Sequence, residues 1–304
     1  MSAAYSHIKT YFRWYLLAIL LILSILLWQV YEHENRHGIL TFAVLDIGQG
    51  DALFIESPIG TQVLVDGGPG RTLMREISGM VPWYDRHIDM IVVTNPDKDH
   101  YEGFIPLLER YRVDMVLEPG TNSPTDTYAY LENEIKEKQI PKLIVKRGEK
   151  FELGGGAYLE ILFPDRDVSG LSSNDGSIVM KLVYGDTSVM LQGDSTAKIE
   201  DYLLTNTATS TLHSTILKAG HHGSKTSSTP EYVAVVAPEV AVASSGADND
   251  YGHPNKETVE TMQKLSIPFY DTCNNGRLVF KSDGKNFTLK NRNPKPAMVG
   301  CKSR

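Results

Sequence analysis

The sequence predicts an α+β domain of packed sheets and helices, preceded by one membrane-spanning helix. Short apolar segments joined by glycine-containing turns are typical of paired strands, and they alternate irregularly with helical segments. This mixed order favours α+β layers over a regularly alternating α/β sheet. The 304 residues are 41% apolar and 22% charged, which excludes a mainly disordered, collagen-like or coiled-coil chain.

The membrane helix is predicted by an uncharged apolar run at residues 14–30. This length nearly spans the hydrocarbon core of a bilayer, and aromatic residues at both ends favour the interface. Lys9 and Arg13 precede the run, so we expect a cytoplasmic N-terminus and an extracytoplasmic remainder. We expect an uncleaved anchor through residues 14–31. The alternatives are a signal peptide, although no small-x-small cleavage pattern follows Trp28, and a buried soluble helix.

The pattern divides the chain into a cytoplasmic tip with anchor and linker (1–37), a globular domain (38–290) and a basic tail (291–304). Expected strands cover residues 40–46, 53–56, 62–65, 90–93, 158–163, 178–184, 188–192, 214–218, 240–244, 268–270 and 277–281. Expected helices cover residues 72–80, 101–111, 125–138, 197–205, 230–236 and 256–264. The tail is rich in basic residues and contains two prolines, and we expect a loose, solvated end rather than a contact with nucleic acid or lipid.

A metal site in this chain must use histidine and carboxylate ligands. Cys273 and Cys301 are the only cysteines, which excludes a disulfide-rich scaffold and a cysteine-built zinc cluster. Nine histidines and 37 acidic residues leave room for such a site.

Side chains that can bind metals follow three of the expected strands. They are Asp97, Asp99 and His100 after strand 90–93, Asp194 after strand 188–192, and His221 and His222 after strand 214–218. Open sheets place ligands at the carboxyl ends of strands. A polar turn or a helix N-cap explains the first two segments about as well when each is taken alone. The three together favour a site for manganese, zinc, iron or magnesium.

The paired histidines lie between Gly220 and Gly223, in a loop that can wrap a small object. Successive side chains of an extended chain point to opposite sides. We therefore expect His221 and His222 not to bind the same ion. His253, in a polar turn, joins the site only if that turn faces the other segments.

These segments together resemble the metallo-β-lactamase superfamily, and more narrowly the hydrolase domain of ComEC-type competence proteins. The matching motifs are LDIGQGDA at 45–52, VDGG at 65–68, NPDKDH at 95–100, GD at 193–194, HHGS at 221–224 and YGHP at 251–254. The resemblance covers residues 40 to 290 and implies a four-layer αββα sandwich with the site at one edge, between the two sheets.

The resemblance implies a divalent metal, zinc or manganese, held by Asp97, Asp99, His100, Asp194 and His221. Two departures from the superfamily pattern weaken one half of the site. Asn95 and Asp97 stand where the first two histidines are usual, and Ser173-Asn174 lies where a middle histidine motif is expected. We therefore expect one tightly bound ion and a second that is weak or absent.

The resemblance also implies a mechanism, in which a metal-activated water attacks a phosphodiester in line. Asp99 is then a catalytic ligand, and Asp97 holds a second ion or acts as base. His222, Lys218 or His253 stabilises the developing charge or protonates the leaving oxygen. Asp66 either orients the 95–100 loop or is a turn residue.

The expected function is therefore that of an anchored metal-dependent hydrolase, a phosphodiesterase or nuclease for DNA uptake or processing at the cell surface. One apolar span forms no channel, so the chain would act beside a separate channel protein or independently. A net charge of −7 opposes long-range attraction to DNA, although local bases at Lys142, Lys146, Arg147 and Lys150 and in the tail could compensate. The alternatives are a hydrolase of a small ester, thioester, lactone or β-lactam, and a non-catalytic binding protein with a degenerate metal site.

Overall fold

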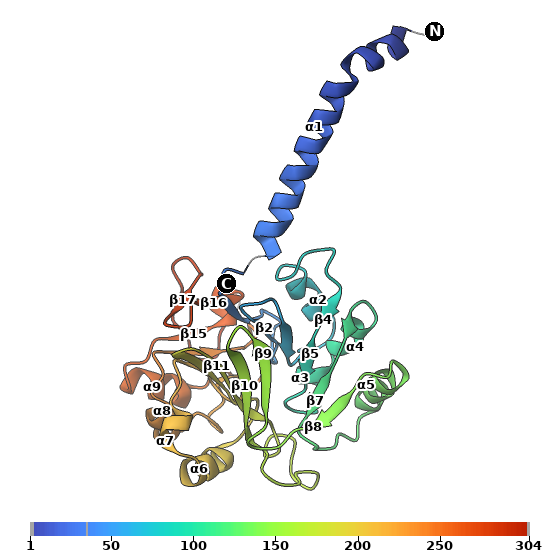
Figure 1. Ribbon diagram of the computed structural model, residues 1–304. Helices are drawn as coiled ribbons and strands as arrows, with labels where there is room; N and C mark the ends of the chain where they lie inside the picture. The colour runs from blue at the N-terminus through green and yellow to red at the C-terminus, as the bar shows by residue number, and fades with distance from the viewer. Residues whose placement is uncertain (1–2, 35, 303–304) are drawn as a thin grey trace. The chain divides into compact units, whose positions relative to one another are not determined.

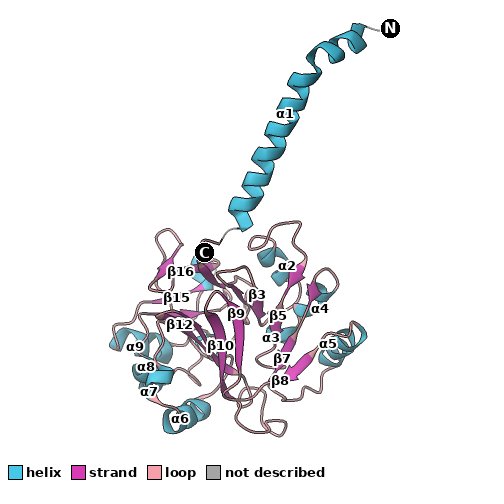
Figure 2. Ribbon diagram, viewed as in Figure 1, coloured by secondary structure: helices cyan, strands magenta, loops and turns pink. Residues whose placement is uncertain are grey.

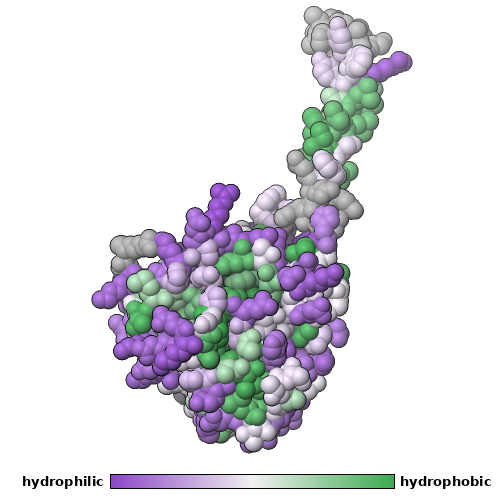
Figure 3. All heavy atoms as spheres, turned by 90° about the vertical axis from the view of Figure 1, so that its left-hand side faces the viewer, coloured by the Kyte–Doolittle hydropathy of each residue, from purple (hydrophilic) through white to green (hydrophobic). Residues whose placement is uncertain are grey.

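The computed structural model describes residues 3–34 and 36–302. The chain forms two units, which divide between His37 and Gly38. The first unit contains helix α1 (Ala3–Glu34). Its window Tyr11–Trp28 is long and apolar enough to cross a membrane, and none of it is buried inside the structure. This exposed apolar surface (green in Figure 3) argues against a helix from a soluble core.

The second unit contains two large sheets (Figures 1 and 2). The eight-stranded sheet has the order β17 (Phe287–Leu289), β16 (Leu278–Ser282), β1 (Leu40–Val44), β2 (Leu53–Glu56), β3 (Gln62–Val65), β5 (Met90–Val92), β7 (Val116–Glu118) and β8 (Lys142–Ile144). The seven-stranded sheet has the order β15 (Phe269–Asp271), β14 (Val240–Ala243), β13 (Ile216–Lys218), β12 (Thr187–Leu191), β11 (Val179–Tyr184), β10 (Ala157–Phe163) and β9 (Lys150–Gly154). A small parallel pair joins β4 (His87–Ile88) to β6 (Arg112–Val113).

Helices cover the outer face of each sheet. Those of the first half are α2 (Thr72–Ile77), α3 (Lys98–Tyr101), α4 (Phe104–Leu108) and α5 (Asp126–Glu137). Those of the second half are α6 (Ala197–Asn206), α7 (Thr209–Leu212), α8 (Pro230–Val236) and α9 (Lys256–Lys264). The short helices η1 (His221–Gly223) and α10 (Thr272–Asn275) lie in the segments that follow β13 and β15.

The four layers enclose three apolar clusters. Side chains of both sheets, such as Phe42 and Leu159, fill the space between the sheets. Leu107 and its neighbours pack between the first sheet and its helices, and Leu203 belongs to the matching cluster on the second. The predicted αββα arrangement is confirmed.

Alternate side chains of the central strands enter different clusters. In β1, Phe42 and Val44 face the other sheet, while Ala43 faces the helices. Because both faces are covered, these strands read as continuous apolar runs rather than as alternating ones. That is why the sequence reveals them by their apolar character and flanking turns.

The predicted helix at 101–111 is wrong in detail, because the chain forms α3 and α4 with Gly103 between them. The amide of Gly103 donates to the carbonyl of Gly68. A Cβ on Gly103 would lie 2.0 Å from the carbonyl oxygen of Gly67. The close approach of this loop therefore requires glycine and interrupts the helix.

The described part of the C-terminal tail is not loose. Cys273 and Cys301 form a disulfide, and the amide of Ala297 donates to the carbonyl of Phe269. Ala297 and Cys301 are buried. The expectation failed because it rested on charge and proline content, whereas a covalent link and the buried residues Ala297 and Cys301 hold the tail in place.

Candidate metal centre

The carboxyl ends of several strands meet at one edge of the sandwich. Strand β3 pairs in parallel with β5, and β12, β13 and β14 pair in parallel with one another. The loops that follow them surround a cavity of about 330 Å³. Its lining consists of Gln49, Asp97, Lys98, Asp99, Asn174, Asp194, His221, His222, Tyr251 and His253. The predicted segments, including the turn of His253, therefore come together.

His100 is completely buried at the floor of this site. Its Nδ1 lies 2.9 Å from Asp66 Oδ2, and its Nε2 lies 3.0 Å from Asp194 Oδ2. Burial alone would lower the pKa of His100, but Asp194 and Asp66 raise it well above its usual value.

Asp66 has two connections to the loop that carries His100. Its Oδ1 accepts a hydrogen bond from the amide of Thr94, and its Oδ2 accepts from the Thr94 hydroxyl as well as facing His100. The backbone of Asp66 is left-handed, with φ 59°. Of the two readings of Asp66, these contacts favour orientation of the 95–100 loop.

His222 lies opposite His100. Its Nδ1 lies 3.0 Å from Asp51 Oδ1, while its Nε2 lies 3.3 Å from Asp99 Oδ2 and 3.6 Å from Asp194 Oδ1. Burial alone would lower the pKa of His222, but Asp194 and Asp51 raise it to about 9. In the absence of a metal, the carboxylates thus favour a charged ring.

Lys218 lies behind the site and does not line the cavity. Its Nζ donates to Asp51 Oδ2 at 2.8 Å and to the carbonyl of Ala219 at 3.0 Å. The side chain is fully buried. It therefore reaches the site through Asp51 and His222, and not by facing the cavity.

The expectation that His221 and His222 do not bind the same ion stays a prediction, but its premise of an extended segment is wrong. Both residues have left-handed backbone angles, with φ 48° and 56°, so the segment is not extended. His221 Nε2 lies 3.7 Å from Asp194 Oδ2, and His222 faces the other oxygen of the same carboxylate. The side chain of His221 is more exposed than that of His222, and its Nδ1 lies 3.0 Å from the hydroxyl of Thr226.

The chemistry and geometry of the site fit a divalent cation. Among the described residues, His100 Nε2, His222 Nε2 and Asp194 Oδ1 are buried and make no hydrogen bond, although both ring nitrogens lie 3.0–3.6 Å from carboxylate oxygens of Asp99 and Asp194. Asp99, His100 and His222 offer ligand atoms that all lie within 4.8 Å of one another. Buried polar atoms are normally satisfied. Imidazole nitrogens and carboxylate oxygens that converge without hydrogen bonds between them are therefore suited to a shared ion.

Asp97 lies in the cavity wall, outside this tight group. Its Oδ2 accepts a hydrogen bond from the hydroxyl of Ser173 at 2.7 Å. Asn95 donates to Asn174 Oδ1 at 2.8 Å. Amide and hydroxyl groups thus bond to one another at the positions where the superfamily pattern has histidines, which leaves fewer ligands on this side.

His253 is buried and lines the cavity, with its Nδ1 3.3 Å from Gln49 Nε2. Burial, His222 and His221 lower the pKa of His253 to about 4, so its ring is neutral near pH 7. Gln49 donates to Nδ1, which places the ring proton on Nε2.

Two contributors received no role from sequence reasoning, namely Gln49 and Asp51. Both lie in the turn between β1 and β2, where Gly48 and Gly50 flank Gln49. The signal for Asp51 was a carboxylate two residues before the apolar strand β2. Its partners, Lys218 and His222, are distant in the sequence, so only the fold identifies them.

No family model matches the chain. It is 26% identical over 257 residues to ComE operon protein 3 of Bacillus subtilis, which covers 78% of this chain and 32% of that protein. It is 27% identical over 251 residues to competence protein ComA of Neisseria gonorrhoeae, and this match covers 81% of this chain and 32% of that protein. The chain therefore spans about a third of the length of these relatives.

Among solved structures, the diiron β-hydroxylase CmlA from Streptomyces venezuelae superposes with a TM-score of 0.52. The match covers 79% of this chain and 53% of that one, at 16% sequence identity. Such a likeness concerns the fold alone. The sequence matches, the four layers and the position of the polar edge agree with one another, and the chain is similar to ComEC-type competence proteins over most of its length and has the expected αββα architecture.

Proposed function

We propose that the chain is a membrane-anchored, metal-dependent hydrolase that cleaves phosphodiester bonds in DNA. The observation that carries the proposal is the meeting of His100 Nε2, His222 Nε2 and Asp194 Oδ1, all buried, close to one another and without a hydrogen bond within the described residues. The competence-protein relatives support DNA as the substrate.

In this proposal, Asp99, His100, Asp194 and His222 hold one ion firmly. This set differs from the one implied by resemblance, because His222 is closer than His221 to the other ligand atoms. His221 faces the second oxygen of Asp194 and, with Asp97, provides a weaker second position. The small number of ligands there supports the expectation of a weak second ion.

A divalent ion supplies Lewis acidity and lowers the pKa of water. The protein holds the two imidazoles in place, with Asp66 bonded to His100 and Asp51 bonded to His222. Such carboxylate–histidine pairs fix ring orientation and tautomer. Neutral His253 presents an Nε2 proton with which it can stabilise a developing oxyanion.

The cavity lining favours a polar substrate over the alternatives. All ten lining residues carry a polar or charged group, whereas a lactone or β-lactam hydrolase would need an apolar pocket. Lys98 at the rim offers a positive charge to a phosphate.

We further propose that α1 anchors the protein and that the domain lies outside the cytoplasm. The basic flank of α1 supports this orientation, and so does the Cys273–Cys301 disulfide, because disulfides persist in oxidising compartments. A separate channel protein would then carry the strand across the membrane.

The test is cleavage of linear single-stranded DNA by the full chain in detergent or nanodiscs. Manganese or zinc should support turnover, and EDTA or Asp99→Ala should abolish it. Asp186→Ala, in an exposed turn, is the matched control and should cleave like the unmodified protein. No cleavage by folded, metal-loaded protein would refute the proposal and favour a binding protein.

A further inference from the structure

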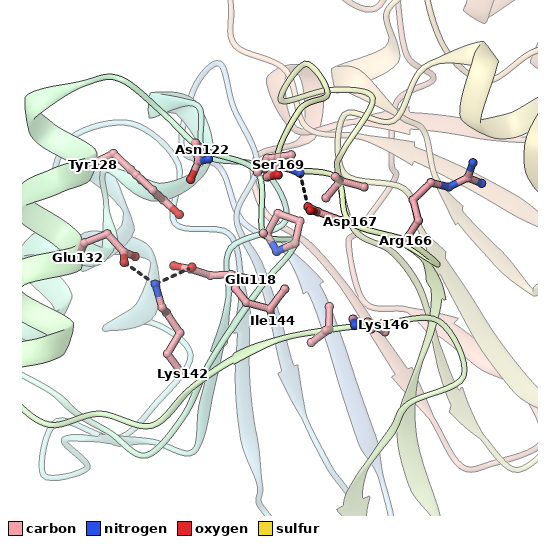
Figure 4. A pocket seen from close by; sticks show the side chains of 15 residues that line it. Glu118, Asn122, Tyr128, Glu132, Lys142, Ile144, Lys146, Arg166, Asp167 and Ser169 are labelled. Carbon is pink, nitrogen blue, oxygen red and sulfur yellow. Dashed lines mark hydrogen bonds and ion pairs between the residues drawn. The ribbon is translucent and has the colours of Figure 1, made fainter.

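A second and larger cavity, of about 630 Å³, lies at the carboxyl ends of β7 and β8. Figure 4 shows Glu118 and Lys142 pointing toward each other beside Glu132, with Tyr128 and Asn122 on the same side of the cavity. Asp167 and Ser169 come from the loop after β10 and lie across the opening. Nothing in the proposed mechanism uses this cavity.

The second cavity shares an edge and a wall with the metal centre. Strands β5, β7 and β8 are parallel neighbours, so their carboxyl ends lie along one edge. Thr121, in the second cavity, packs so closely on Gly176 that a Cβ there would lie 2.1 Å from Thr121 Cγ2. Asn174, two residues before Gly176, lines the first cavity. A polymer held at one cavity can therefore reach the other.

Three polar atoms from residues that line this cavity are buried and lack hydrogen-bond partners within the described chain: Glu118 Oε1, Thr121 Oγ1 and Glu132 Oε1. The other oxygens of Glu118 and Glu132 pair with Lys142 Nζ. Glu118 is only 3% exposed and Thr121 only 4%. Tyr128 and Glu132 also interact electrostatically with Glu118. Buried acceptors are costly when they lack well-placed donors, so the oxygens without a hydrogen bond point to a ligand with N–H groups.

The inner wall of this cavity, formed by Glu118, Glu132 and Lys142, carries more negative than positive charge and so disfavours an anion. Two carboxylates share one ammonium group, that of Lys142. Burial and Glu132 raise the pKa of Glu118 to about 7, as expected where negative charge is crowded. Ile144 and Val168 add apolar surface. At the rim, exposed Lys146 can meet a phosphate.

We propose that this cavity binds a nucleobase with an exocyclic amine, from the strand whose backbone lies at the metal centre. The amine donates to Glu118 Oε1 and Thr121 helps to position the base edge, while Lys146 contacts the adjoining phosphate. Cytosine, adenine and guanine carry such an amine, and thymine does not. The inference rests on the proposed function, which supplies the strand.

The test uses the full chain in nanodiscs with EDTA, and calorimetric titration with dCMP and dTMP. A hydrogen bond to a charged acceptor typically changes affinity about tenfold or more. In a buffer above the raised pKa of Glu118, where its carboxylate is ionised, dCMP should therefore bind about tenfold more tightly than dTMP. Glu118→Leu should remove this preference while Lys142 keeps Glu132 as its partner. Thr121→Val, which leaves the Glu118–Lys142 pair intact, should weaken dCMP binding severalfold. Glu109→Gln, at an exposed site, should change nothing.

Equal affinity for the two nucleotides, or an unchanged preference in Glu118→Leu, would overturn the inference. Loss of dCMP binding in Asp99→Ala but not in Glu118→Leu would also overturn it, because the nucleotide would then occupy the metal centre. These measurements need no metal and no cleavage. A protein that cannot cut DNA but prefers dCMP would refute the proposed function and leave this site standing.

Discussion

Asp51 joins Lys218 to His222, with one carboxylate oxygen 2.8 Å from the lysine Nζ and the other 3.0 Å from the histidine Nδ1. All three side chains are buried. The lysine keeps the pKa of Asp51 low, at about 2, against the opposing effect of burial. The aspartate thus stays ionised and can hold the Nδ1 proton of His222, which leaves Nε2 free for a cation.

Asp51→Asn should therefore weaken metal binding without removing any ligand. The amide cannot hold His222 in the same tautomer, and loss of such a supporting carboxylate typically costs about 10- to 100-fold in affinity. Equilibrium dialysis with zinc would measure this, with exposed Asp186→Asn as the control. Wild-type affinity in Asp51→Asn would show that His222 is not a ligand.

The two adjacent histidines should differ in their effect on metal content. His222→Ala removes a buried nitrogen from the tight group, whereas His221→Ala removes a more exposed ring next to the other oxygen of Asp194. We expect the tightly held ion to be lost in the first variant and largely retained in the second. Metal analysis after gel filtration distinguishes them. Loss of the ion in His221→Ala and its retention in His222→Ala would support the ligand set implied by resemblance.

Asp194→Ala should be more severe than either histidine change. Its carboxylate faces His100 and His221 with one oxygen and His222 with the other. We expect no retained metal and no turnover, with the fold kept, as judged by circular dichroism. A variant that still bound one ion at full occupancy would contradict the shared role of this carboxylate.

Glu118 should make stability depend on pH. Its pKa rises from 4.5 to about 7 on folding, so the folded chain binds more protons between these values. Stability should then fall as pH rises from about 4.5 to 7, by about 1–3 kcal/mol from this group. Urea unfolding at pH 5 and pH 7 would measure the decline. Glu118→Gln should reduce it, and an equal decline in the variant would rule out Glu118 as the source.

Cys273→Ser or Cys301→Ser should destabilise the domain. The bond closes a segment with a sequence separation of 28, and a native disulfide of this kind contributes about 2–4 kcal/mol. In thermal unfolding, a reducing agent should lower the midpoint temperature of the unmodified protein and leave that of the variants unchanged. Unaltered unfolding on full reduction would mean that the tail is held by its other contacts.

Most buried strands and three of the segments that line the candidate metal site were predictable because they combine local apolar runs with polar residues at their ends. The strand β8 was missed because all three of its residues are exposed and its pattern lacks an apolar face. The orientation of His221 and His222 was missed because it depends on two left-handed residues that are not glycine. The local sequence does not predict a left-handed backbone at two histidines.

The partners of Lys218 and Glu118 were unpredictable for another reason. Lys218 meets Asp51 across 167 positions of sequence, and the second cavity combines residues from β7, α5, β8 and the loop after β10. These contacts depend on the order of the strands in the two sheets, which could not be predicted from the sequence. The resemblance supplied the architecture, while the supporting contacts came from the structure.

The docked tail has a consequence for maturation. The carbonyl of Cys301 accepts from the amide of Asp248, and the amide of Gly300 donates to the carbonyl of Pro254. The tail thus braces both ends of the segment that carries His253. If the domain crosses the membrane as proposed, this brace is locked only after export, when the thiols are oxidised. The cavity that His253 lines would then be completed only outside the cytoplasm. Nucleic acid in the cytoplasm would not meet the completed site.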